Sequence, residues 1–220
     1  MSNDLKVYKF SLPKEQDTID LMNAFADSVF CKSPVDFSKP ENVLTISFNG
    51  EQGVGKTVCA KIFMEAAGVV PEIGWRKFFK EYELPLNKSL IRHIDAKGLA
   101  ERLFGFPTSN EMDFLKDRKA GGAELVECGN SGDSFQIYKK RKDKSFTFNG
   151  YDYDYEFYLD RKHATHDQIE AWRKNPTTEN LVAISPLFQP RTLTLICPEK
   201  NTVKSEFQTF LKQVQHLRAA

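Results

Sequence analysis

The sequence lacks the features that mark membrane proteins and disulfide-stapled proteins. No uninterrupted apolar run approaches the roughly 18 residues that a bilayer-spanning helix needs. Residues 1–6 have no apolar core of the kind found in secretory signals. The cysteines are few and scattered, and no two are spaced as CxxC: Cys31, Cys59, Cys128 and Cys197. We therefore expect a cytoplasmic protein with no membrane attachment, no disulfide framework and no structural zinc site.

An excess of charge of one sign is also absent. The chain has 31 basic and 30 acidic residues, which leave a formal net charge of +1. Such a balance excludes a global field that would recruit nucleic acid or membrane, so either partner would have to be held by a local patch. The 220 residues, 40% of them hydrophobic, suffice for one sizeable core. We expect a single domain over 1–220.

Strand-like and helix-like patterns alternate along the chain. Apolar or β-branched runs predict strands, and apolar residues at every third or fourth position predict helices. The predicted strands are 6–10, 43–48, 89–94, 123–127, 151–159 and 192–197, and the predicted helices are 13–29, 58–66, 99–104, 111–116, 168–174 and 203–217. This mixture predicts an α/β fold, with a central, mostly parallel sheet flanked by helices. The polar segment 161–190 is interpreted as an insertion within the domain.

A glycine-rich loop carries the clearest chemical signal. Its eight residues match GxxxxGK[ST] without a mismatch, after a predicted buried strand and before a predicted amphipathic helix. Glycines let such a loop curl so that successive backbone N–H groups face a polyphosphate, and the helix N-terminus adds attraction. We therefore expect the loop to bind a nucleoside triphosphate through Gly50, Glu51, Gln52, Gly53, Val54, Gly55, Lys56, Thr57 and Val58.

The last two residues of the loop have specific predicted roles, and the site needs a carboxylate in addition. Lys56 would reach the β- and γ-phosphates, and the Thr57 hydroxyl would ligate Mg²⁺. Such a site also needs a carboxylate at the carboxyl edge of the sheet. Asp95 and Glu127 both follow predicted strands, and the distance from the loop favours Asp95 over Glu127.

The loop also resembles that of a known family, the bacterial tRNA threonylcarbamoyladenosine biosynthesis ATPases (TsaE). That family's loop reads G-[DE]-L-G-A-G-K-T, and Glu51 and Gly53 are positions that a generic phosphate loop need not have. His93-Ile94-Asp95 is similar to the family's H-x-D element, and Val126-Glu127 to its strand-end glutamate.

The resemblance implies an accessory ATPase. It implies Lys56 on the phosphates and Thr57, Asp95 and Glu127 around Mg²⁺. It also implies hydrolysis of ATP by water, and a protein partner in the complex that transfers threonylcarbamoyl to tRNA. The sequence departs from the family at Cys128, where tryptophan is usual, and in the segment 69–87, which has no counterpart of the threonine- and serine-rich switch.

The residues alone are compatible with three other functions of a protein that has a phosphate loop. The missing switch favours a nucleotide-switched, non-hydrolysing interaction module, whereas the intact Lys56-Thr57 pair and Asp95 oppose it. A GTPase is suggested by the D-x-x-G pattern at 95–98, but no N-K-x-D motif reads a guanine base. A small-molecule kinase would need lid arginines, for which Arg102 and Arg118 are the candidates.

A predicted β-hairpin carries charges of both signs. Asn149-Gly150 is a strong two-residue turn signal between the runs 135–148 and 151–159. A basic cluster at 139–144 could touch a tRNA backbone. An acidic row on the facing strand, Asp152, Asp154, Glu156 and Asp160, would neutralise that cluster by cross-strand pairing. We favour a self-complementary hairpin over a tRNA site.

Overall fold

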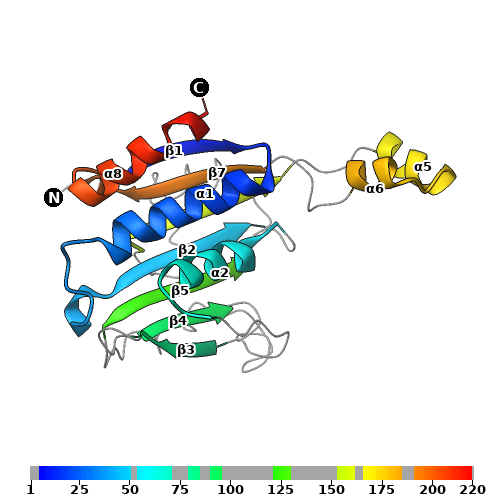
Figure 1. Cartoon of the computed structure of the whole chain (residues 1–220). Helices are drawn as coiled ribbons and strands as arrows, with labels where there is room; N and C mark the ends of the chain where they lie inside the picture. The colour runs from blue at the N-terminus through cyan, green and yellow to red at the C-terminus, as the bar shows by residue number, and fades with distance from the viewer. Residues whose placement is uncertain are drawn as a thin grey trace, which may run out of the picture.

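A seven-stranded sheet organises the chain (Figure 1). The computed structural model describes residues 5–50, 54–70, 79–84, 90–95, 121–129, 153–161, 166–184 and 191–219. The strands are β1 (Leu5–Leu12), β2 (Leu44–Gly50), β3 (Phe79–Glu83), β4 (Leu90–Asp95), β5 (Gly122–Gly129), β6 (Tyr155–Arg161) and β7 (Arg191–Pro198). Their spatial order is β1-β7-β6-β2-β5-β4-β3.

The centre of the sheet is parallel and its two sides are antiparallel. β2 pairs in parallel with β5 and β6, and β4 pairs in parallel with β5. β7 runs antiparallel to both β1 and β6, and β3 runs antiparallel to β4. The predicted α/β class is confirmed, with a parallel centre inside a mixed sheet. The carboxyl ends of β2, β4, β5 and β6 therefore share one edge, where the antiparallel β7 begins.

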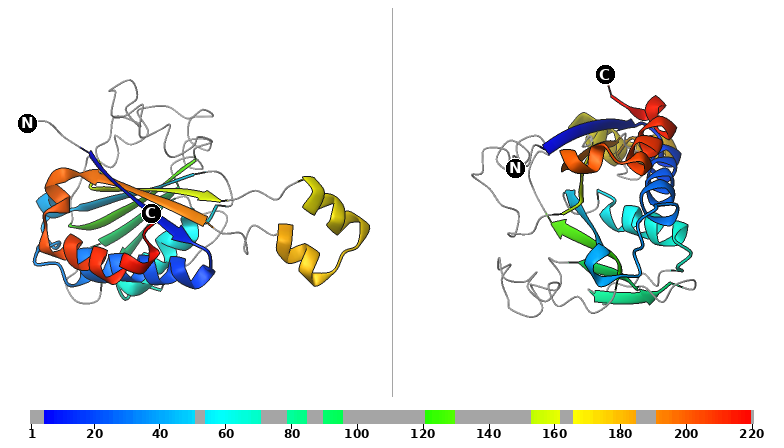
Figure 2. Two further views of the ribbon diagram at one scale, coloured as in Figure 1. Left: turned by 90° about the horizontal axis from the view of Figure 1, so that it is seen from above. Right: turned by 90° about the vertical axis from the view of Figure 1, so that its left-hand side faces the viewer.

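Three helices cover one face of this sheet (Figure 2). They are α1 (Glu15–Ala26), α2 (Lys56–Ala66) and α8 (Ser205–Gln213). A π-helical turn, Asp27–Cys31, continues α1, and the short α7 (Glu199–Thr202) precedes α8. Within the described residues, no helix combines the length and apolar character needed to cross a bilayer.

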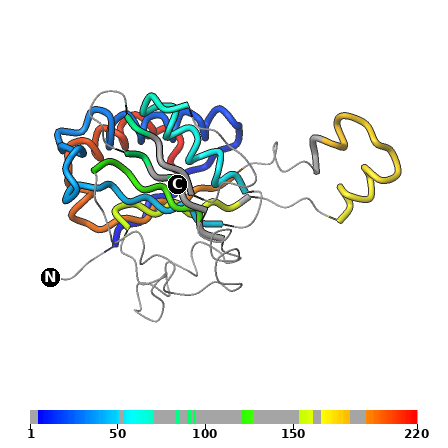
Figure 3. The backbone as a smooth tube through the Cα atoms, turned by 90° about the horizontal axis from the view of Figure 1, so that it is seen from below, coloured from blue at the N-terminus to red at the C-terminus, as the bar shows by residue number. Residues whose placement is uncertain are grey.

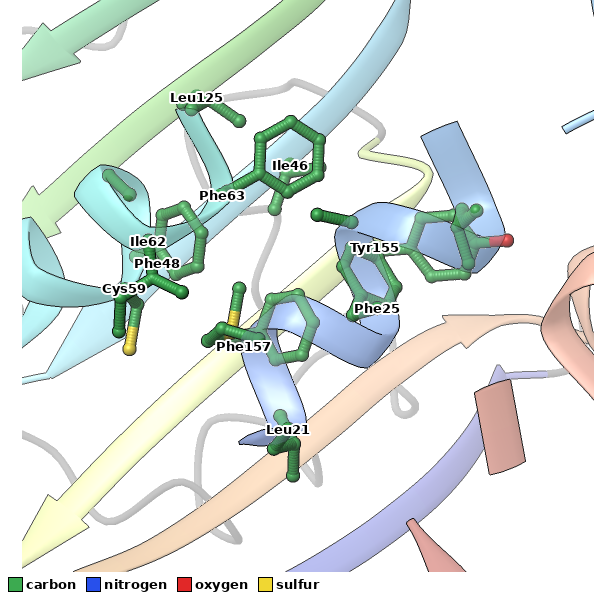
Figure 4. Packing of buried hydrophobic residues seen from close by; sticks show 14 of the residues in the cluster. Leu21, Phe25, Ile46, Phe48, Cys59, Ile62, Phe63, Leu125, Tyr155 and Phe157 are labelled. Atoms are coloured by element: carbon green, nitrogen blue, oxygen red, sulfur yellow. The ribbon is translucent and has the colours of Figure 1, made fainter. Parts of the chain in front are cut away.

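Aromatic side chains from the helices and the central strands fill the layer between them (Figure 4). Phe25 of α1 is fully buried, and its ring lies 4.8 Å from that of Phe157 and 5.1 Å from that of Tyr155. Alternation along each strand sends every second residue to this layer, so Ile46 and Phe48 of β2 face the helices. The core therefore holds α1 against β6, and α2 against β2 and β5.

A pair of helices stands away from the sheet (Figures 1 and 3). α5 (His166–Lys174) and α6 (Thr178–Ile184) lie between β6 and β7 in the chain and pack against each other. The helix predicted over 168–174 is thus confirmed. This helix lies inside the segment 161–190, which the sequence predicts to be an insertion.

The predicted hairpin is wrong in its second strand. Residues 155–158 of β6 pair with β2 on one side, and residues 156–161 pair with β7 on the other. A central strand has no free edge for a hairpin partner. The reason is long-range burial, because Tyr155, Phe157, Tyr158 and Leu159 place large side chains on both faces, and Glu156 is only 2% exposed. The remainder of the predicted hairpin, including the basic cluster at 139–144, lies outside the described residues.

Two smaller predictions also differ from the structure. Trp75, Phe78, Phe79 and Tyr82 have the spacing of an aromatic stripe on a helix, yet residues 79–83 form β3, which pairs antiparallel with β4. Val203, predicted on the apolar stripe of the terminal helix, is 75% exposed because it lies at the break between α7 and α8. The short helices predicted over 99–104 and 111–116 lie outside the described residues.

Two buried thiols predict a loss of stability at alkaline pH. Burial raises the pKa of Cys59 and the pKa of Cys197 from 9.0 to about 12. These thiols stay protonated in the folded protein while they ionise in the unfolded chain, so their contribution to stability is complete below pH 9 and is lost as the pH rises towards 12. Urea unfolding across this range should show a shallower decline for Cys59→Ala than for the wild type. Equal slopes would contradict the prediction.

Candidate functional site

The glycine-rich loop connects the buried central strand β2 to the helix α2. Gly50 ends β2 with φ of 142°, and Gly55 precedes α2 with φ of 109°, both in the region that favours glycine. A Cβ on Gly50 would lie 2.5 Å from the carbonyl oxygen of Leu159. The strand–loop–helix context that the sequence predicted is therefore present. Glu51, Gln52 and Gly53 lie outside the described residues.

Lys56 folds back over the loop from the first turn of α2. Its Nζ donates a hydrogen bond to the backbone carbonyl oxygen of Gly50, at 2.9 Å. The side chain is partly buried, so the ammonium group is held next to the loop backbone rather than extended into solvent. The helix N-terminus adds its own partial positive charge at the same place. Lys56 and the helix N-terminus therefore both bring positive charge to the end of the loop.

Thr57 is joined to the strand-end glutamate. The Thr57 hydroxyl donates to Oε2 of Glu127 at 2.7 Å, and the ring Nε2 of His93 lies within hydrogen-bonding distance of Oε1 of the same carboxyl group, at 2.6 Å. The side chains of His93 and Glu127 are 12% and 7% exposed. The parallel pairing of β4 with β5 brings His93 and Glu127 to the start of α2. A buried carboxylate is thus oriented by two neighbours.

Asp95 lies beside Glu127 in the backbone. The two residues are register partners at the carboxyl ends of β4 and β5. The structure therefore brings both predicted acidic positions to the edge that carries the loop, and it places Glu127, the less favoured of the two, in contact with Thr57. Among the described residues, no three side chains of the metal-ligating types cluster together.

Arg191 is a residue that sequence reasoning missed. It is the first residue of β7, and its guanidinium lies against Gly55: a Cβ built on Gly55 would be 3.1 Å from Nη1 of Arg191. The residue is 7% exposed. The signal that would have found it is its position, because an antiparallel strand begins at the edge where the parallel strands end.

Burial differs among three apolar residues in and next to the predicted loop. Val54 is 2% exposed and packs in the core, whereas Val58 points outward and is 38% exposed. Cys59 is fully buried in α2, and burial raises its pKa to about 12. A thiol held in its protonated form is a poor nucleophile, so the chemistry of this site does not run through Cys59.

A cavity of about 240 Å³ lies at the opposite edge of the sheet. Its lining includes Val43 and Leu44 at the start of β2 and Asp154 and Tyr155 at the start of β6. The glycine-rich loop follows the other end of β2. The cavity and the loop are therefore separate features.

Comparison with known proteins gives a structural likeness without a match in sequence. No protein-family model matches the sequence. No curated protein matches it either. Among solved structures, the chain is similar to the crystal structure of YdiB from Bacillus subtilis, with a TM-score of 0.46 and 14% sequence identity over 98% of each chain.

Proposed function

We propose that this protein binds ATP with Mg²⁺ at the glycine-rich loop and hydrolyses it. The observation that carries the proposal is the hydrogen bond between Thr57 and Glu127 at the end of the loop. The motif alone specifies a hydroxyl after the lysine. The fold adds a buried carboxylate 2.7 Å from that hydroxyl, contributed by a neighbouring parallel strand.

In this proposal, the loop and its two basic elements bind the polyphosphate. Backbone N–H groups around Gly55 and at the start of α2 would donate to phosphate oxygens. Lys56, whose Nζ contacts the Gly50 carbonyl in the structure, would exchange that contact for the β- and γ-phosphates. The contact with Gly50 already holds the ammonium group beside the end of β2, where the loop begins.

The residues around Thr57 have the chemistry that Mg²⁺ requires. This ion prefers hard oxygen ligands together with phosphate and water oxygens. Thr57 and Glu127 would hold it, with Asp95 as a further carboxylate at the same edge. When bound, the ion would neutralise charge on the β- and γ-phosphates. His93 would keep the Glu127 carboxylate oriented.

Hydrolysis in this proposal uses water as the nucleophile. A water oxygen bonds to the γ-phosphorus while the bond from that phosphorus to the bridging oxygen breaks, giving ADP, inorganic phosphate and a proton released to solvent. The protein's contribution is positioning and neutralisation of charge, with no covalent intermediate. The buried, protonated Cys59 is consistent with that absence.

The finer proposal concerns the pathway. The residues Gly50, Glu51, Gly53, Asp95 and Glu127 support membership of the accessory ATPases of tRNA threonylcarbamoyladenosine modification. ATP hydrolysis would then reset a partner complex that transfers threonylcarbamoyl to tRNA. The experiment specific to this proposal measures phosphate release with and without that complex.

Replacing Glu127 by glutamine tests the hydrolysis proposal. The amide keeps the shape of the side chain but removes the negative charge, so phosphate release from ATP and Mg²⁺ should fall by about 10–100-fold, the range seen when metal-site groups are altered. The measurement is release of inorganic phosphate at increasing Mg²⁺ concentrations. Glu65→Gln is the matched control, because Glu65 lies on α2 with a side chain 49% exposed and pairs with Lys61.

The outcomes separate hydrolysis from switching. Unchanged phosphate release in Glu127→Gln would exclude the role proposed for this carboxylate. Mg²⁺-dependent ATP binding by the wild type without any phosphate release, with or without the partner complex, would identify the non-hydrolysing module instead. Failure of the wild type to bind ATP would overturn the proposal as a whole.

A further inference from the structure

Arg191 places a guanidinium beside the glycine-rich loop from a strand far away in the sequence. The end of β2 and the start of β7 come to the same edge because β7 runs antiparallel to β6, which in turn lies next to β2. A Cβ built on Gly55 would lie 3.1 Å from Nη1 and 3.5 Å from Cζ of Arg191. The planar group therefore rests on the loop residue that precedes Lys56.

The guanidinium lacks an acceptor where one is needed. Five buried side-chain polar atoms have no hydrogen-bond partner in the part of the chain that the structure describes, and Nη1 of Arg191 is the one that belongs to a charged group. Arg191 is 7% exposed, and its Nη1 atom is shielded from bulk solvent. A buried N–H group of a charged side chain that lacks an acceptor is costly. A ligand that supplies an anion would remove this cost.

The two residues paired with Arg191 in the sheet are not acidic. They are Leu12 on β1 and Arg161 on β6. On the other side are Gly55 and the N-terminus of α2, whose backbone N–H groups also favour an anion. On its loop side, Arg191 therefore meets groups that favour a negatively charged ligand.

We infer that Arg191 binds the β- and γ-phosphates of the nucleotide, acting with Lys56 as a second cation; this inference rests on the proposed function. A guanidinium presents parallel N–H donors that match two oxygens of one phosphate, whereas the lysine ammonium acts as a point charge. Because Arg191 lies on Gly55, it reaches the phosphates that the loop backbone binds there. Its burial on a strand holds it in place before the nucleotide arrives, so little side-chain freedom is lost on binding.

Arg191→Met tests this inference by titration calorimetry with ATP and with inorganic tripolyphosphate. Methionine keeps an unbranched apolar stem and removes the guanidinium. Loss of a charge-assisted contact should weaken both ligands by about 10–100-fold. Similar losses for both ligands would locate the contact on the phosphates rather than on the base or the sugar. The apo variant should unfold at a temperature equal to or above that of the wild type, because a buried donor without an acceptor has been removed.

Two further variants complete the test. Arg173→Met is the matched control: Arg173 lies on α5, its side chain is 63% exposed, and it pairs with Glu170. It should bind both ligands as the wild type does. Arg191→Lys keeps the charge without the planar fork and should lose about 10-fold in affinity for ATP. It provides the same test if the methionine variant does not fold.

The outcomes distinguish this inference from the function on which it rests. Wild-type affinity for ATP and tripolyphosphate in a folded Arg191 variant would overturn the inference and leave the proposed function standing. If the wild type binds neither ligand, both fall. Weakened binding of both ligands, with the control unchanged, would establish Arg191 as a phosphate-binding residue.

Discussion

Lys56→Ala is expected to abolish the stabilisation that ATP and Mg²⁺ give to the protein. A ligand at about one hundred times its dissociation constant adds about 2.7 kcal/mol to the free energy of unfolding. For a chain of this size, that corresponds to a rise in melting temperature of roughly 5–10 °C. The variant should show almost none of this rise, because the ammonium that lies over the loop is the mobile cation available to the phosphates.

The control for this prediction lies on the same helix. Lys61 lies on α2, five residues after Lys56, and its ammonium group pairs with Glu65 at 3.5 Å. The variant Lys61→Ala should keep the full rise in melting temperature. Melting curves with ATP, GTP and a non-hydrolysable ATP analogue, each with and without Mg²⁺, complete the measurement. An equal ATP shift in Lys56→Ala and the wild type would place nucleotide binding elsewhere. A larger shift with GTP than with ATP would favour the GTPase alternative.

Phe25→Ala is expected to lower the free energy of unfolding by about 3–5 kcal/mol. The ring is fully buried and lies between the central strand β6 and the terminal helix α8, 4.8 Å from Phe157 and 5.3 Å from Phe210. Its removal opens a cavity and ends several edge-to-face aromatic contacts, each worth about 0.5–1.5 kcal/mol beyond burial. Urea unfolding followed by circular dichroism measures the loss, and an unchanged m-value would show that the unfolded state is not altered.

Two comparisons make this measurement specific. Phe25→Leu keeps most of the volume and should cost less than Phe25→Ala. Val203→Ala alters an apolar residue that is 75% exposed and should stay within about 0.5 kcal/mol of the wild type. A loss below about 1.5 kcal/mol in Phe25→Ala would mean that the helix layer rests on other contacts.

The loop illustrates what can be predicted from the sequence of this protein. Its glycines, lysine and threonine are consecutive, so their spacing is set by the covalent chain, and a buried β-branched strand before them is a local pattern. The same holds for most of the strands and for α1, α2, α5 and α8, whose periods are local. These predictions agree with the structure to within a few residues at each end.

Partner choice between distant segments was not predictable in this way. The Asn149-Gly150 signal favoured a hairpin, but residues 155–158 pair with β2 instead, because burying both faces of an apolar strand outweighs a local turn preference. The preference for Asp95 over Glu127 rested on chain distance, whereas the contact of Glu127 with Thr57 depends on the register of β5 beside β2.

The sequence by itself determined the α/β class, the glycine-rich loop between a buried strand and a helix, and the residue types available for phosphate and Mg²⁺. The tertiary structure decided that Thr57 and His93 orient one carboxylate, Glu127, and that Arg191 lies on Gly55. The physical reason is sheet order: parallel strands end where the antiparallel β7 begins, so residues more than a hundred positions apart meet at one edge.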